Sequence, residues 1–197
     1  MKNSESRIAG SVLSLALPAV ALLLSPLLSA QAEPGNDNRA PTVPASLKVP
    51  EGNKVSLHAY AVGVQIYHAT ASTTSPTGFA WTFFAPEAVL YDADGNIIGI
   101  HYAFAGPTRP AWETKSGSRV VGARTVAPVT VNSSAIPWLI LSAVPTNTIG
   151  PGVLDRTTYI QRVNTRGGLA PVAAPTALDQ EARVSYTAEY FFYREQN

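Results

Sequence analysis

The feature that most constrains the fold is an alternation of apolar and polar residues with a period of two, which is the spacing of a half-buried β-strand. It occurs over residues 54–59, 62–66 and 81–83. The longest case is residues 183–192, whose apolar positions are Val184, Tyr186, Ala188, Tyr190 and Phe192. Residues 136–144 are apolar on both faces, as in a strand covered from two sides. The sequence therefore predicts an all-β domain of about ten mostly antiparallel strands, in a sandwich or flattened barrel.

The pair Asp94-Gly95 separates two such stretches and suits the two-residue turn of a tight hairpin, because both residue types tolerate positive φ. This turn would place Ala88 opposite His101 on one face of the hairpin. It would place Val89 opposite Ile100 on the other face. We expect the second, more apolar face to be core and the His101 face to be open.

The first 32 residues resemble a signal peptide. Basic residues precede an apolar run over residues 8–28, which ends in the small residues of Ala30-Gln31-Ala32. A retained transmembrane anchor is the alternative, but two prolines interrupt the run. We predict cleavage between Ala32 and Glu33, which leaves an exported protein with no membrane span, located in the periplasm or outside the cell.

After cleavage, residues 33–47 are rich in proline and lack periodicity, and we expect a flexible lead-in. Residues 48–197 would then form one domain. The remaining chain has equal numbers of acidic and basic residues and no basic cluster, so we expect no nucleic acid partner. The chain has no cysteine, hence no disulfide.

A proline- and glycine-rich loop after His101 leads to Trp112 and Glu113, and the predicted turn places Asp92 on the face of His101. These four residues are the candidate ligand-binding site. The alternative is that His101 is a histidine at a strand end, hydrogen-bonded to loop backbone.

The other two histidines favour structural roles. His58 shares a face with Lys54 and Ser56, so we expect it to be solvated, whereas His68 shares parity with Val64 and should point to the apolar side. Because His58 and His68 have opposite parities, a three-histidine metal site is disfavoured, and we predict neither a metal nor a cofactor.

Several segments in order resemble a known family, among them "VPEGNKVSLHAYAVGVQIYHA", "APEAVLYDADGNIIGIHYA", "IPWLILSAV" and "YIQRVNTRGGLAP". From about Val49 to Tyr193 the chain is similar to the domain-of-unknown-function 3455 family of small exported bacterial and fungal proteins. The resemblance implies no activity. His68 stands where relatives often carry a cysteine, and "FAGPTRPA" is longer than the usual bridge. Some fungal relatives carry a dehydrogenase name, which we reject here because no G-x-G-x-x-G follows a strand.

Together these features favour a β-domain that binds a small molecule, a saccharide or an envelope component around His101 and Trp112. The alternative hypothesis is a metal-assisted or acid/base enzyme that uses His101 with Asp92 or Glu113. The G-x-S-x-G motif of serine hydrolases is absent.

Overall fold

The computed structural model describes residues 39–106 and 109–196, all of which belong to one compact unit, residues 33–197. The expected signal peptide and its cleavage site lie outside the described residues. Within the described ranges there is no α-helix, and consequently none that is long and apolar enough to cross a membrane. Two short 3₁₀ turns occur, at Ala45–Leu47 and Pro145–Asn147.

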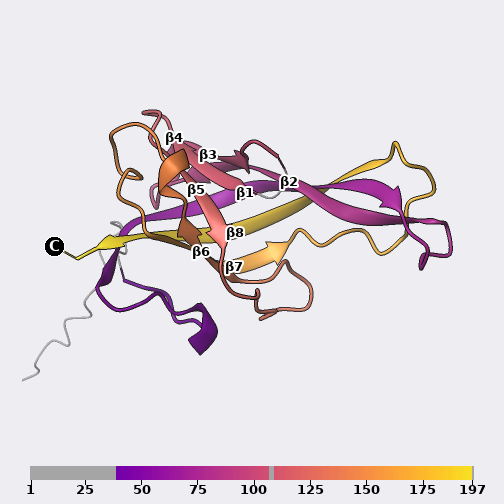
Figure 1. Ribbon diagram of the computed structural model, residues 1–197, viewed down its shortest axis with the longest axis horizontal. Coiled ribbons are helices and arrows are strands. Elements are labelled where there is room, and N and C mark those ends of the chain that lie inside the picture. Colours follow the sequence, from indigo (N-terminus) through magenta and orange to yellow (C-terminus); the bar gives the residue numbers. More distant parts are fainter. Residues whose placement is uncertain (1–38, 107–108, 197) are drawn as a thin grey trace, which may run out of the picture. The chain divides into compact units, whose positions relative to one another are not determined.

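Eight strands form a single antiparallel sheet (Figure 1). Their bounds are β1 Asn53–Ala71, β2 Phe79–Tyr91, β3 Ile97–Ala103, β4 Pro110–Thr114, β5 Arg119–Arg124, β6 Leu139–Ala143, β7 Tyr159–Gly167 and β8 Glu181–Glu195. Each strand pairs with the next, and β8 pairs with β1, so the sheet closes into a ring. The all-β antiparallel prediction is confirmed. The strand number is lower than the expected ten, partly because residues 54–59 and 62–66 belong to one long strand, β1.

The ring is not an even barrel, because its strands differ greatly in length. β1 spans 19 residues and β8 spans 15, whereas β4 and β6 span 5 each. The pairing of β2 with β3 begins only at Ala88, although β2 itself begins at Phe79. β1, β2 and the first part of β8 therefore continue past the ring as a three-stranded extension, which Figure 1 shows.

The β2–β3 hairpin confirms the predicted partners Ala88 with His101 and Val89 with Ile100. Its turn is one residue longer than expected, because the Asp92 N–H donates to the Asn96 carbonyl at 3.0 Å and encloses residues 93–95. Gly95 adopts a φ of 81°, the left-handed conformation that such a turn requires. A register shift between Leu90 and Tyr91 absorbs the additional residue and restores the predicted pairing.

The prediction of which hairpin face is core was wrong. His101 and Leu90 are buried inside the ring, whereas Ile100 on the other face is 48% exposed. The small residues that suggested an open face are required by close packing instead. A Cβ atom at Gly99 would overlap the Glu113 carbonyl oxygen of β4, so the strands could not pair as they do with a larger residue there.

Apolar side chains pack on both sides of the sheet. The inner cluster is Ala59, Ala61, Ala88, Leu90, Trp112, Val120, Ile136, Leu141, Leu154, Ile160, Tyr186, Ala188, Tyr190 and Phe192. The outer cluster is Val55, Val163, Phe191 and Tyr193, against which Val43, Val49, Trp138 and Tyr159 pack. Leu47, in the expected lead-in, is fully buried, and its carbonyl accepts a hydrogen bond from Gln161 of β7. Residues 43–49 thus cover the outer face of the sheet.

We predict that Gly99→Ala lowers the free energy of unfolding by about 1–3 kcal/mol, because the added methyl group has to displace backbone. Gly122→Ala is the matched control, since its Cβ would meet side-chain atoms of Trp112 and Leu141 at 3.1–3.4 Å, and these can shift. Urea unfolding of both variants measures the difference. Equal losses of stability would contradict the close approach of β3 and β4.

Candidate functional site

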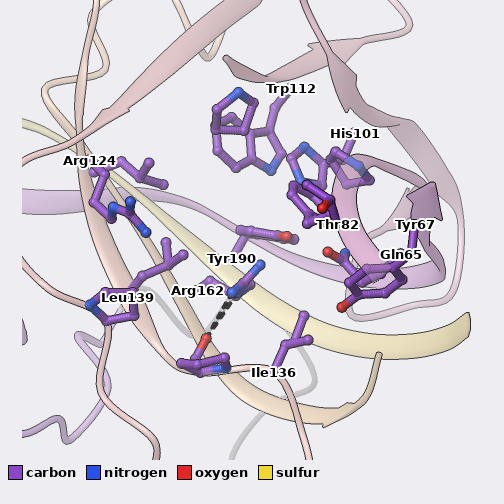
Figure 2. A pocket seen from close by; sticks show the side chains of 16 residues that line it. Gln65, Tyr67, Thr82, His101, Trp112, Arg124, Ile136, Leu139, Arg162 and Tyr190 are labelled. Carbon is purple, nitrogen blue, oxygen red and sulfur yellow. Dashed lines mark hydrogen bonds between the residues drawn. The ribbon is translucent and has the colours of Figure 1, made fainter. Parts of the chain in front are cut away.

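A cavity of about 610 Å³ lies where the ring passes into the three-stranded extension, and every strand contributes at least one side chain to it (Figure 2). It is open to solvent on one side, where Thr82, Phe83 and Arg124 are exposed. We call it the interior cavity. Its lining consists of Gln65, Tyr67, Thr82, Phe83, Pro86, His101, Pro110, Trp112, Arg124, Pro128, Ile136, Pro137, Leu139, Leu141, Arg162 and Tyr190. Most of these side chains are aromatic or aliphatic, because successive strands direct alternate residues inward. The walls therefore suit an apolar molecule.

Two of the four predicted site residues, His101 and Trp112, meet in this cavity. They are direct partners on β3 and β4, and their rings stack with centroids 4.4 Å apart and planes 6° apart. The Tyr190 ring meets His101 edge-on at 5.0 Å. His101 is 2% exposed and Trp112 is 1% exposed. The predicted pair is thus part of an enclosed aromatic wall, whereas the sequence suggested a shallow surface site.

The contacts of His101 fix its chemical state. Its Nδ1 lies 2.8 Å from the Ala111 carbonyl oxygen, which can only accept, so Nδ1 carries the hydrogen and Nε2 is the acceptor. Burial lowers the pKa of His101 from 6.5 to about 3, and the positive charge of Arg162 acts in the same direction. His101 is accordingly neutral at ordinary pH. The alternative prediction was a histidine hydrogen-bonded to loop backbone. The observed bond does go to a backbone carbonyl, but that carbonyl belongs to strand β4 and not to a loop.

Arg162 is the residue that the sequence analysis missed. It lies on β7, and its Nε and one terminal nitrogen donate to the Pro137 carbonyl at 3.2 and 2.9 Å (Figure 2). No carboxylate of the described chain lies within ion-pair distance of it, and no aspartate or glutamate lines the cavity. No signal in the sequence singled it out, because β7 also carries Gln161, Asn164 and Arg166 among its apolar residues.

Buried polar atoms gather on the same side of the ring as Arg162. Tyr186 interacts with Gln65 and Tyr190, and the Tyr190 hydroxyl also interacts with Arg162, although none of these contacts of Gln65, Tyr186 and Tyr190 has regular hydrogen-bond geometry. Burial raises the pKa of Tyr190, and the Arg162 charge partly offsets this effect. Burial also raises the pKa of Tyr186, and the neighbouring Tyr190 adds to it. Burying polar groups that are not fully hydrogen-bonded costs free energy. Hydrocarbon side chains at these positions would therefore make a more stable interior.

The other two predicted site residues lie away from the interior cavity. Asp92 caps the β2–β3 turn, where its carboxylate accepts from the Asn96 backbone at 2.8 Å and from the Asn96 side chain at 3.0 Å. These bonds, that of the side chain foremost, lower the pKa of Asp92. Glu113 alternates with Trp112 on β4 and faces outward, accepting a 2.7 Å hydrogen bond from Tyr102. Neither carboxylate lines the cavity wall that His101 forms.

Both other histidines differ from expectation. His58 is buried, stacks on Phe191 at 4.0 Å and contacts Glu189 at 2.9 Å, so its predicted solvation was wrong. A register shift between Val55 and Leu57 changes the parity before His58.

His68 is half-exposed and lies 3.2 Å from Glu181, so its predicted apolar setting was also wrong. It keeps the parity of Val64, but the alternate residues Gln65 and Tyr67 line the cavity. In the described part of the chain no group of three potential ligands is placed to hold a metal ion.

The fold and the cavity define a class, that of an antiparallel sheet closed around an apolar interior. The chain belongs to the protein family of unknown function DUF3455, whose match covers residues 50–194. The resemblance noted from the sequence is therefore confirmed. No match was found among curated proteins or solved structures.

We predict that the stability of the protein falls as the pH drops from 6.5 towards 4.5, by up to about 1.4 kcal/mol per pH unit. The unfolded chain binds a proton on His101 in this range, but the folded chain does not. The bond to His58 is the main cause that lowers the pKa of Glu189. The stability that Glu189 contributes is therefore lost only below pH 4.5, which is the ordinary pKa of this carboxyl group. Urea unfolding at several pH values measures the slope. His101→Gln should flatten it, and an unchanged slope in that variant would contradict a neutral, buried His101.

Proposed function

We propose that the protein binds a small, largely apolar molecule in the interior cavity. The observation that carries the proposal is the cavity itself, a hollow with a mainly apolar wall into which a few polar groups converge. A volume of about 610 Å³ lies within the range of small-molecule pockets, and eight-stranded closed sheets are wide enough to hold one small ligand.

Among the ligand classes considered from the sequence, the lining favours an apolar molecule over a saccharide. A saccharide needs many hydrogen-bonding groups around it, whereas this wall is mainly proline, leucine, isoleucine and aromatic rings. His101 and Trp112 contribute a flat stacked surface against which an apolar ring or chain can pack.

Binding is also favoured over catalysis centred on His101. A general acid or base needs a pKa near the working pH, whereas burial lowers that of His101 to about 3. Its sequence-suggested partners, Asp92 and Glu113, do not line the same wall. With the signal peptide expected from residues 1–32, the proposal is for an exported binding protein that carries or sequesters its ligand outside the cytoplasm.

We expect the purified domain to bind N-phenyl-1-naphthylamine, an uncharged probe whose fluorescence rises in apolar surroundings. Leu139→Trp, which adds an indole to the cavity wall, should weaken this binding at least about ten-fold by occupying the space. Ile97→Trp is the control, since Ile97 is exposed and does not line the cavity. Fluorescence titration gives the affinities, and thermal melts verify that both variants fold. Absence of binding, or equal binding by both variants, would refute the proposed function.

A further inference from the structure

We infer that the ligand of the interior cavity is an amphipathic monocarboxylate, whose acidic group pairs with Arg162 while its apolar body lies against Trp112 and Leu139. This inference rests on the proposed function and specifies the chemical class of the ligand. It does not follow from the cavity alone, because an apolar cavity without a charged residue would select a hydrocarbon.

The first support is the position of an uncompensated positive charge. Arg162 is only partly exposed and lines the cavity, and no carboxylate in the described chain pairs with it. Burial lowers the pKa of His101 and raises those of Tyr67 and Tyr190, and the Arg162 charge adds to the first effect and partly offsets the other two. All three residues line the cavity. A partly desolvated guanidinium is costly unless an anion accompanies it. The cavity thus contains a positive field and no protein anion to balance it.

The second support is the geometry of the guanidinium. Its Nε and Nη2 atoms are both directed at the Pro137 carbonyl, which holds the group in a fixed orientation. The guanidinium also interacts with the Tyr190 hydroxyl, and within the described residues it makes no ion pair with a carboxylate. A guanidinium has five N–H groups, so donors remain for the paired oxygens of a carboxylate. Figure 2 shows Arg162 among the cavity side chains, below Tyr190.

The third support is the surroundings of this charge. Gln65 and Tyr190 line the cavity and carry buried polar groups, of which the Tyr190 hydroxyl interacts with Arg162 and the Gln65 amide with Tyr186. The Tyr190 hydroxyl and the Gln65 amide nitrogen form no bond of regular geometry there, and both can donate to a bound carboxylate. Arg124, which is exposed and also lines the cavity, adds a second positive charge that can attract an anion from solvent. The rest of the wall is apolar. Of the two cations in the wall, Arg162 is the one that is partly buried and held in a fixed orientation, and with apolar walls around it the cavity matches one negative charge on an apolar body.

The test compares 1-pyrenebutanoic acid with 1-pyrenebutanol, which share the aromatic body and differ in the charged group. For the wild-type protein at pH 7.5 and low salt, fluorescence titration should show the acid binding at least about ten-fold more tightly than the alcohol. Arg162→Met should abolish this preference and leave the affinity for the alcohol unchanged. Arg166→Met is the matched control, because Arg166 is an exposed arginine on the same strand that does not line the cavity.

The outcomes separate the two proposals. If neither compound binds the wild-type protein, the proposed function fails and the inference fails with it. If both bind with similar affinity, or if Arg162→Met keeps the preference for the acid, the cavity binds apolar molecules but Arg162 does not select a carboxylate. Arg162→Gln, which can still donate to the Pro137 carbonyl, replaces Arg162→Met if that variant does not fold. The wild-type comparison by itself can overturn the inference.

Discussion

The structure depends on the pairing of β1 with β8, the first and last strands of the domain. The pairing runs from Asn53 opposite Glu195 to His68 opposite Glu181, and it turns a linear meander into a ring. These partners are separated by more than a hundred positions in the chain, so bringing them together costs loop-closure entropy. The burial of apolar side chains on the two strands offsets this cost. Ala59, Ala188 and Phe192 on these two strands supply part of the inner cluster.

Closure also creates the interior in which function is proposed. A sheet closed on itself directs alternate side chains inward, where each must either pack or line a space. Gly122 leaves room for the large ring of Trp112, since a Cβ atom there would meet that ring at 3.1 Å. Closure by β1 and β8 brings Tyr190 of β8 against the stacked pair of His101 and Trp112, and the three residues share one wall of the cavity.

Local patterns in the sequence were sufficient for the all-β class and for the pairing of Ala88 with His101 in the β2–β3 hairpin, and they suggested that Trp112 lies near His101. They could not give the inward face of that hairpin, because Ile100 looks more like a core residue than His101 until the ring is known. Nor could they give Arg162, since buried Ile160 and Val163 flank it on opposite faces of β7. The extra residue in β1, Ser56, likewise leaves no mark in a period-two pattern.

The extension of β2 beyond the ring has a consequence for how copies of this protein behave towards one another. Between Phe79 and Glu87, β2 bonds to β1 on one side, and its pairing with β3 has not yet begun. Such an edge, with Phe83 and Phe84 exposed on it, is a template for strand addition from another molecule. Pro86 has no N–H group, and Phe84 is an extra residue without a partner in β1, so the edge of β2 is irregular at two neighbouring places. Both irregularities work against the addition of a strand from another molecule.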